Sequence, residues 1–397
     1  MSLRWQQRLT ERQQQRQQLG LWRSRPLLTS APGVRVQVNG QWLINFASND
    51  YLGLAESPDL PLLAQGLHQE AGNAGSTASH VLAGHHLPHH LLEDELADWL
   101  GVERVLLFSS GYLANLAVQT ALLQDGDALY HDKLNHASLL DGARLSSAHF
   151  QRYAHNDMEA LARRLAQPTD GLTMVVTDGV FSMDGDSVCL GKMLPLVAEQ
   201  DGLLVVDEAH SFGVLGEQGR GLFVHQQQAA DASVLRVGTL GKAFASSGAF
   251  IAGSGLLIDS IAQWGRSYIY TTAQPPYQAS FSRAALRLLA GEVGDAARAK
   301  LDELIAVFRQ GAQALGLSLL PSSTPIQPIV LGSNDRALAW QAKLWQSGFW
   351  LPAIRPPTVA EGTARLRVSL SAQHSVEQIE SLLTALAACQ REEGACV

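Results

Sequence analysis

The chain has 397 residues, of which 46% are hydrophobic and 17% are charged, with a formal net charge of −8. These values predict a globular protein with more than one core, because single cores stop growing at about 250–300 residues. The acidic balance and the lack of a long run of one charge argue against a nucleic acid or a membrane as a partner.

The three cysteines, Cys189, Cys389 and Cys396, are scattered along the chain. They form no C-x-x-C pair, so we expect neither a disulfide framework nor a zinc-thiolate site, and the cytoplasm is the expected compartment. The N-terminus has no apolar h-region, and no run reaches about 18 apolar residues, so we expect neither a signal peptide nor a transmembrane helix.

The N-terminal segment is rich in glutamine between residues 6 and 18, where charged residues alternate with Leu9 and follow Trp5. This pattern favours a helix on the protein surface. The helix and the arm that follows it form the first predicted segment, residues 1–50.

From residue 51, short apolar runs alternate with helical patterns. Continuous apolar runs that end in polar residues are typical of strands buried on both faces. We therefore expect an α/β domain with a mainly parallel sheet over residues 51–275. The expected strands are residues 104–110, 127–132, 173–181, 202–210, 234–240 and 248–254.

A double proline at positions 275 and 276 marks a new unit, residues 276–397. A long helical pattern follows it, over residues 279–315. Strand and helix patterns then alternate to a last helix that ends near residue 391. We expect a smaller α+β domain here.

Ligands of open parallel sheets bind beyond the carboxyl ends of the strands. Polar side chains follow the expected strands here: His136, Ser182, Asp207, His210, Thr239 and Lys242. Each alone has an ordinary interpretation as a helix cap, a turn residue or a surface charge. Their convergence with a strand-to-helix turn at Gly111 and Tyr112, which can bind a phosphate, favours a functional site.

Lys242 lies in "VLRVGTLGKAFASSGAF", residues 234–250, which contains no carboxylate. A lysine amine can form a Schiff base with an aldehyde, and few charged neighbours would lower the pKa of that amine. Pyridoxal 5'-phosphate is an aldehyde that also needs a phosphate cradle and a carboxylate at its ring nitrogen. Asp207 can supply the carboxylate, so the sequence predicts this cofactor.

Two other motifs have different interpretations. "VVDEAH" and "GTLGKA" resemble parts of an ATPase, but a P-loop requires glycine where Arg236 stands and serine or threonine where Ala243 stands. We therefore do not expect an ATPase. In "GHHLPHHLLEDE", histidines in i, i+4 spacing can bind zinc, but Pro88 favours the start of a helix. We predict no metal site. The histidines of this run are His85, His86, His89 and His90.

Five motifs resemble those of the α-oxoamine synthases, which are fold-type I pyridoxal phosphate enzymes. They are "SNDYLGL" (48–54), "NHASLLDG" (135–142), "GVFSMDGD" (179–186), "DEAHSFGVLGEQGRG" (207–221) and "GTLGKAF" (238–244). The resemblance covers the chain from about residue 20. It implies a large domain with a seven-stranded sheet, a small C-terminal domain, and a homodimer with shared active sites.

Within this family, residues 353–370 resemble the member that joins L-alanine to a pimeloyl thioester, with loss of carbon dioxide, in biotin biosynthesis. The alternative is a sister activity, such as the condensation of glycine with acetyl-CoA. The sequence leaves open whether coenzyme A or an acyl carrier protein carries the pimeloyl group.

The resemblance also implies roles for single residues. Lys242 would carry the cofactor and later move the α-proton of alanine. Asp207 would pair with the ring nitrogen, and His136 would stack on the ring and contact the substrate. Further contacts to the cofactor are implied for Gly111, Tyr112, Ser182, His210 and Thr239.

Other implied roles concern the substrates and the second subunit. Arg355 would bind the alanine carboxylate, and Thr358 would lie in the substrate pocket. Arg23 matches the N-terminal substrate arginine of the family, with Arg25 as the alternative in register. Thr271 and Thr272 would reach the cofactor phosphate of the neighbouring subunit.

Overall fold

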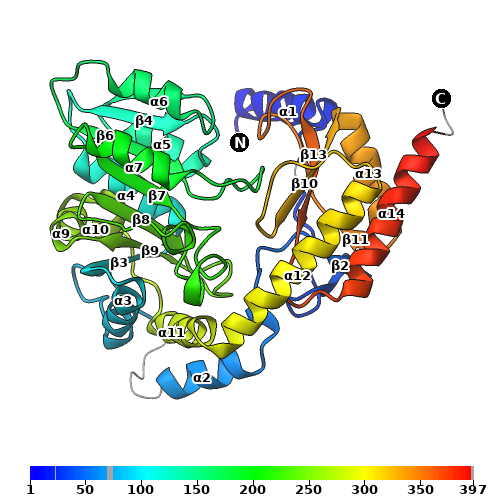
Figure 1. Ribbon diagram of the computed structural model, residues 1–397, viewed down its shortest axis with the longest axis horizontal. Coiled ribbons are helices and arrows are strands. Elements are labelled where there is room, and N and C mark those ends of the chain that lie inside the picture. The colour runs from blue at the N-terminus through cyan, green and yellow to red at the C-terminus, as the bar shows by residue number, and fades with distance from the viewer. Residues whose placement is uncertain (23, 69–74, 395–397) are drawn as a thin grey trace.

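The computed structural model describes residues 1–22, 24–68 and 75–394, which form two units side by side (Figure 1). The larger unit holds a seven-stranded sheet in the order β3-β9-β8-β7-β6-β4-β5. Its strands are β3 (Arg104–Phe108), β4 (Ala128–Asp132), β5 (His149–Tyr153), β6 (Thr173–Asp178), β7 (Leu203–Asp207), β8 (Val234–Thr239) and β9 (Ala249–Gly253). All neighbours are parallel except β9, which is antiparallel to β3 and β8. The prediction of a mainly parallel sheet is confirmed.

Both faces of this sheet are buried, because successive side chains of a strand point to opposite faces. Val175 and Val206 belong to the core on one face, and Val176 and Val205 to the core on the other. This double burial explains the continuous apolar runs in the sequence. The helices of the unit are α3 (Leu87–Leu100), α4 (Gly111–Leu122), α5 (Ala137–Leu145), α6 (Met158–Leu165), α7 (Leu190–Ala198), η2 (Glu217–Gly219), α8 (Leu222–His225), α9 (Gly255–Trp264) and α10 (Arg266–Ile269).

The smaller unit contains a three-stranded antiparallel sheet in the order β10-β13-β12. Its elements are β10 (Ile326–Gly332), β12 (Ala353–Ile354), β13 (Ala364–Ser369), α12 (Glu292–Ala314), α13 (Asn334–Gln346) and α14 (Val376–Gly394). The predicted α+β character of the C-terminal region is confirmed. No helix in the described part of the chain is both long and hydrophobic enough to cross a bilayer.

A second small sheet attaches the N-terminal arm to this unit. The hairpin of β1 (Arg35–Val38) and β2 (Gln41–Asn45) pairs through β2 with β11 (Phe349–Trp350), which runs parallel to it. The arm and the C-terminal unit are therefore built together, although they are far apart in the sequence.

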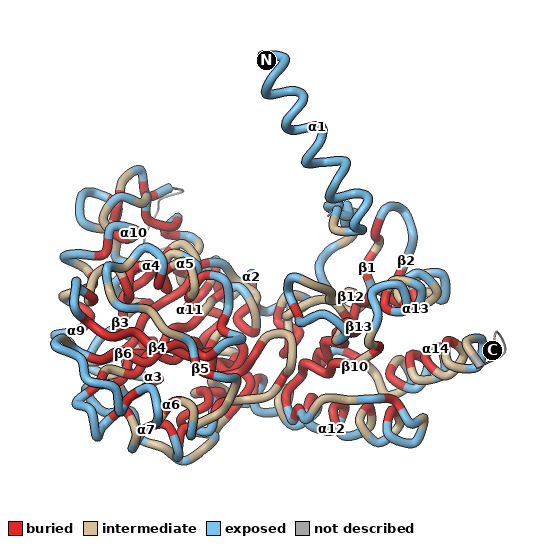
Figure 2. Tube along the Cα trace, turned by 90° about the horizontal axis from the view of Figure 1, so that it is seen from above, coloured by how far each residue is buried: buried red, intermediate tan, exposed pale blue. Residues whose placement is uncertain are grey.

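The N-terminal helix α1 (Leu3–Gln18) projects from the body, and none of its residues is buried (Figure 2). The predicted surface helix is thus confirmed. Trp5 on this helix is 56% exposed, and Trp22, just beyond it, is 49% exposed. Large exposed apolar side chains on one projecting segment are typical of a surface that packs against another chain.

The prediction of one helix over residues 279–315 is wrong. The structure has two helices, α11 (Pro276–Ala290) and α12, separated by Gly291 in an extended conformation. The corner is tight, because a Cβ on Gly294 would lie 1.9 Å from the backbone oxygen of Leu289. The break lets α11 pack against α2 (Asp59–His68) and α3 of the larger unit.

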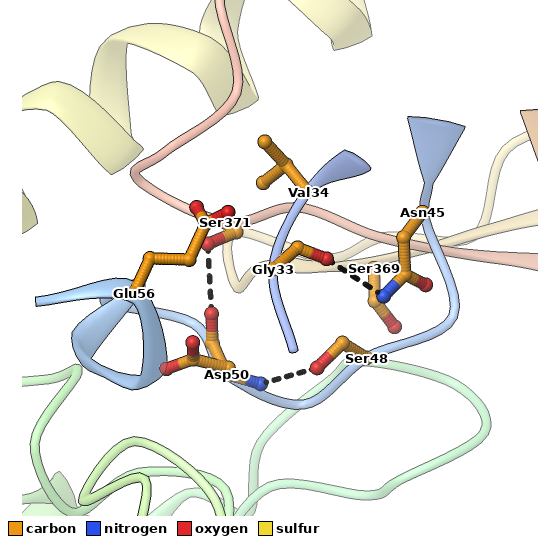
Figure 3. Close-up of a pocket in the computed structure, with 8 residues that line it drawn as sticks. All are labelled: Gly33, Val34, Asn45, Ser48, Asp50, Glu56, Ser369 and Ser371. Atoms are coloured by element: carbon orange, nitrogen blue, oxygen red, sulfur yellow. Dashed lines mark hydrogen bonds between the residues drawn. The ribbon is translucent and has the colours of Figure 1, made fainter. Parts of the chain in front are cut away.

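The loop between β2 and η1 (Leu54–Glu56) is tied to the chain that follows β13 (Figure 3). Ser371 Oγ donates to the backbone oxygen of Asp50 over 2.7 Å, and the Asp50 N–H donates to Ser48 Oγ over 3.1 Å. The cavity between them measures about 10 Å³, which is room for about one water molecule. This anchoring places Asn49 and Tyr51 beside the larger sheet.

Candidate active site

A cavity of about 340 Å³ lies at the carboxyl ends of β6, β7 and β8, between the two units. Its volume is in the range of small-molecule sites. Eight of the predicted cofactor residues line it: Gly111, Tyr112, His136, Ser182, Asp207, His210, Thr239 and Lys242. Residues that are spread over 132 positions of the sequence thus meet in one place, because the carboxyl ends of parallel strands share one edge of the sheet.

Lys242 is the amine of this cavity. Its Nζ lies 2.8 Å from Nε2 of His210. Burial lowers the pKa of Lys242 to about 8, although the charges of Asp207 and Asp178 oppose the shift. A neutral amine is the nucleophilic form, so the lowered pKa makes more of the amine able to attack an aldehyde near neutral pH than in an exposed lysine.

His210 connects Lys242 to a buried polar chain. Its Nδ1 lies 2.7 Å from the hydroxyl of Tyr51, which donates to Oδ1 of Asn49 over 3.1 Å. Burial, together with the charges of Lys242 and Arg367, lowers the pKa of His210 well below its usual value. A neutral His210 ring can accept a hydrogen bond from Lys242 at Nε2 and donate one to Tyr51 at Nδ1.

Asp207 ends β7 and is held from two sides. Its Oδ2 accepts from the side-chain amide of Asn115 over 2.7 Å, and its Oδ1 accepts from the Ala209 N–H over 2.9 Å. The same Asn115 amide also donates to Ser138 Oγ over 2.9 Å. These contacts fix the direction of the carboxylate within the cavity.

His136 stands at the N-cap of α5, and its ring lines the cavity. Its Nδ1 lies 2.7 Å from Ser138 Oγ, and its backbone N–H donates to Asp178 Oδ2 over 2.7 Å. Burial and the charge of Asp207 raise the pKa of Asp178 well above its usual value. A protonated Asp178 would reduce the negative charge beside Asp207.

Two features of the cavity suit a phosphate. The first turn of α4 begins at Gly111 and Tyr112, and the N–H groups of a first turn have no partners within their helix. The hydroxyl of Thr239 accepts from the Gly241 N–H over 3.2 Å and donates to the Gly248 oxygen over 3.2 Å. Gly111 has open space at its Cβ position, with the nearest atom 4.0 Å away.

The residues present therefore fit pyridoxal phosphate. The cavity contains an amine of lowered pKa, a fixed carboxylate, an imidazole and a helix N-terminus. These are the groups that the aldehyde, the ring nitrogen, the ring face and the phosphate require.

A second cavity, of about 620 Å³, adjoins the first and shares His136, Ser182 and Met183 with it. Thr358 lines this second cavity. Much of its lining is apolar, including Leu140 and Val359.

Other predicted site residues lie outside both cavities. Arg355 is half-buried and donates to the backbone oxygen of Gly20 over 2.5 Å. Thr271 and Thr272 lie after α10, where Thr272 bridges to Ser79. Arg23 lies outside the described residues, and its alternative Arg25 is exposed.

Sequence reasoning missed several residues that line or support the main cavity. Arg367 of β13 lines it, and its Nε donates to the backbone oxygen of Ser182 over 2.6 Å. Its remaining nitrogens donate to Ser369 Oγ and to Asn49 Oδ1. One signal was available, since arginine is rare inside an apolar strand and "ARLRVSL" contains two. Asn49, Asn115, Ser138 and Asp178 were missed too.

Comparison with known proteins identifies the class. The family model described as aminotransferase class I and II matches residues 42–386, and the chain belongs to this family. A curated relative from Hydrogenovibrio crunogenus is 53% identical over 372 residues, which is 93% of each chain. That relative is named 8-amino-7-oxononanoate synthase.

Solved structures agree on the fold. A serine palmitoyltransferase from S. paucimobilis with bound PLP–myriocin aldimine has a TM-score of 0.90 at 27% identity, over 98% of both chains. The 8-amino-7-oxononanoate synthase from Francisella tularensis has a TM-score of 0.76 at 31% identity, over 88% of this chain and 98% of that one. The predicted fold-type I architecture is confirmed.

Proposed function

We propose that the chain condenses L-alanine with a pimeloyl thioester, in the biotin pathway, to give 8-amino-7-oxononanoate, carbon dioxide and the free thiol carrier. The observation that carries the proposal is the pairing of the buried Lys242 amine with the fixed Asp207 carboxylate in one cavity. The curated relative that is 53% identical over 93% of the chain supports this choice within the family.

Bound pyridoxal phosphate supplies an electron-withdrawing ring that acidifies the α-C–H bond of the amino acid. Lys242 would bind the aldehyde carbon, and Asp207 would hold the proton of the ring nitrogen. The N-terminus of α4, with Thr239, would hold the phosphate, and His136 would cover one face of the ring.

Lys242 is also the base for the α-proton. With the amino acid bound, the Nζ atom would be available as a base, because its pKa is lowered to about 8 and about half of the amine is neutral at that pH. His210, 2.8 Å from Nζ, would orient the amine through a hydrogen bond at Nε2. Lys242 then holds the proton that is later returned to the product.

The carboxylate of alanine needs a cation in the cavity. Arg367 is the arginine that lines it, and hydrogen bonds to Ser182, Ser369 and Asn49 fix its guanidinium. We therefore propose that Arg367 binds the alanine carboxylate. This replaces the expectation from the sequence, which gave that role to Arg355. A fixed guanidinium orients the carboxylate, and the orientation decides which bond of the substrate is weakened.

The second cavity is the proposed place of the acyl donor. It opens beside His136 and Ser182, where the thioester carbon would have to meet the amino acid. Its apolar wall suits the methylene chain of a pimeloyl group, and Thr358 would contact the substrate there. Either coenzyme A or an acyl carrier protein would serve as the carrier.

The proposed assembly is a cytoplasmic homodimer with shared active sites. Thr271 and Thr272 lie outside the cavities of their own chain, and they would reach the phosphate in the partner. The exposed apolar side chains of α1 and of the segment after it would pack on the same partner.

Replacement of Lys242 by alanine tests the assignment. The Lys242→Ala variant should lose the visible absorbance of the bound cofactor at its wild-type position and should form no product. Circular dichroism would verify that the variant is folded. A folded Lys242→Ala variant that still forms product would refute the role of this lysine.

A further inference from the structure

We propose that the start of α3 is a binding site for a divalent transition-metal ion of the zinc class, with His85, His90 and Glu93 as ligands. The site is separate from the condensation chemistry and does not depend on it. It revises the sequence prediction of no metal, which was based on the helix start at Pro88. That helix start is present, with Pro88 in the first turn of α3.

The three ligand atoms lie within 4.8 Å of one another. His90 and Glu93 are three positions apart on α3 and so share one face of the helix, while His85 reaches this face from the preceding loop. Nε2 of His85 is 3.8 Å from Oε2 of Glu93. Two ligands at about 2.0–2.2 Å from a tetrahedral zinc ion are separated by about 3.4 Å, so a small side-chain movement completes the geometry.

The chemistry of the set suits zinc better than calcium or magnesium. Two imidazoles and one carboxylate are the ligands of many zinc sites, whereas calcium and magnesium take oxygen ligands. Asp94 lies 3.6 Å from Nε2 of His90 at the edge of the site. A water molecule would take the fourth position, as it does in zinc sites with three protein ligands.

In His85 and Glu93, the polar atom that would not bind the metal has a hydrogen-bond partner. Nδ1 of His85 lies 2.9 Å from Nδ1 of His80, whose ring stacks on Tyr268 at 5.4 Å. Oε1 of Glu93 accepts from the Leu107 N–H over 3.0 Å, which leaves Oε2 directed at His85. Support of this kind fixes the orientation of metal ligands.

Two other clusters of possible ligands are already satisfied within the described residues. In the cluster of His80, His85 and His89, both ring nitrogens of His89 are engaged: Nδ1 accepts from the His86 N–H and Nε2 donates to the Gln274 oxygen. In the other cluster, the two nitrogens of His155 face Asp132 and Asp186, and Asp184 pairs with an arginine. Neither cluster offers three free ligand atoms.

Binding to this site should stabilise the protein, because an ion that binds the folded state shifts the unfolding equilibrium. The ligands come from the start of α3 and from the loop before it, and the ion would join the two. The bond from His89 to Gln274 connects the same loop-to-helix turn to the segment that contains Thr271 and Thr272.

The test uses the untagged holoenzyme after dialysis against a chelator, with Cys189→Ser as background because Cys189 is an exposed thiol. Calorimetric titration with zinc chloride should show one ion per chain and an increase in Tm. His90→Ala and Glu93→Gln should each weaken zinc binding by at least about tenfold. His149→Ala, an exposed histidine elsewhere, is the matched control and should leave the affinity unchanged.

His90 is exposed, so its replacement should leave the fold intact. Cobalt is a second probe: absorption bands of a four-coordinate ion should appear in the wild type and be lost in His90→Ala. The proposal is overturned if zinc binds His90→Ala as tightly as the wild type, or if no stoichiometric binding occurs.

Discussion

At the scale of single residues, burial gives Lys242 its reactivity. The ammonium form would have to be solvated in a cavity that offers the neutral ring of His210 as the nearest partner. The pKa of the amine is therefore lowered to about 8, against the pull of Asp207 and Asp178. A lysine in water would be almost fully protonated at neutral pH.

This shift predicts how the apoenzyme takes up its cofactor. As the pH falls below about 8, a growing fraction of the Lys242 amine is protonated and not nucleophilic, so the rate of Schiff base formation should rise with pH and level off above about 8. Stopped-flow absorbance after mixing apoenzyme with pyridoxal phosphate, from about pH 6 to about pH 10, measures this profile. A rate that keeps rising towards pH 10.5, the ordinary pKa of lysine, would contradict the shift.

Arg367 and Arg355 are the two candidates for binding the alanine carboxylate, and a lysine substitution at each distinguishes between them. Arg367→Lys should lower kcat/KM for alanine by about tenfold to a hundredfold, because lysine cannot reproduce the fork of hydrogen bonds. Arg355→Lys should change it by less than about threefold, since Arg355 contacts Gly20 outside the cavities. Steady-state kinetics with varied alanine concentration measure both effects. The cofactor affinity of each variant is the control. The opposite order of effects would return the role to Arg355.

The sequence predicted the site residues at the strand ends. It did not predict the residues that hold them in place. Lys242, Asp207 and His136 follow apolar runs, and topology alone brings such residues together. Asn115 lies inside α4 and Arg367 inside β13, where the local pattern does not show what they contact. Their roles depend on the packing of distant segments, which one sequence does not specify.

At the scale of secondary structure elements, a buried ion pair joins β7 to β8. Nε of Arg236 donates to Oε1 of Glu208 over 2.5 Å, and both side chains are at most 3% exposed. Glu208 also accepts from Ser211 and Leu222, so the pair fixes the loop after β7 that contains His210.

Loss of one member of this pair should be costly. Arg236→Leu should lower the free energy of unfolding by about 3–5 kcal/mol, because Glu208 would remain as an unpaired buried charge. Urea denaturation measures the change. The exposed pair of Arg104 and Asp259 is the matched control, and Arg104→Leu should cost less than about 1 kcal/mol. Equal effects of Arg236→Leu and Arg104→Leu would contradict this expectation. The double substitution Arg236→Met with Glu208→Gln should recover part of the stability, because it leaves no unpaired buried charge.

Elements with one dominant pattern were predictable. The central strands were found because burial on both faces leaves a continuous apolar run. β5 was missed because its sequence, "HFQRY", mixes polar and apolar residues at the sheet edge. The corner at Gly291 was missed because the helical period continues on both sides of it. We propose the larger unit as residues 51–275 and the smaller as residues 276–397, with the arm attached to the smaller. The first helix of the smaller unit, α11, crosses the boundary and packs on α2 and α3 of the larger one.

At the scale of the whole molecule, we propose a dimer in which each chain contributes to the site of the other. Thr271 and Thr272 would complete the phosphate site of the partner, although they line neither cavity of their own chain. Replacement of both by alanine should therefore weaken cofactor binding by about tenfold, the loss of one to two hydrogen bonds. Titration of the apoenzyme measures this change.

Mixing two variants tests directly whether each active site contains residues of both subunits. Lys242→Ala and the Thr271→Ala/Thr272→Ala variant each lack one half of every site. At a cofactor concentration that leaves the Thr271→Ala/Thr272→Ala variant largely empty, a symmetric dimer that exchanges chains would contain one intact site in half of its molecules, so the mixture should regain about a quarter of wild-type activity. Light scattering should show a dimer. A mixture no more active than its components, or a monomer, would contradict the shared site.

The central claim is the reaction itself. Purified holoenzyme is incubated with L-alanine and pimeloyl-CoA, or with pimeloyl-acyl carrier protein, and the products are analysed by mass spectrometry; glycine with acetyl-CoA serves as the competing pair. The account predicts 8-amino-7-oxononanoate and one carbon dioxide for each thiol released, with alanine strongly preferred. Turnover of glycine and acetyl-CoA without that product would contradict it.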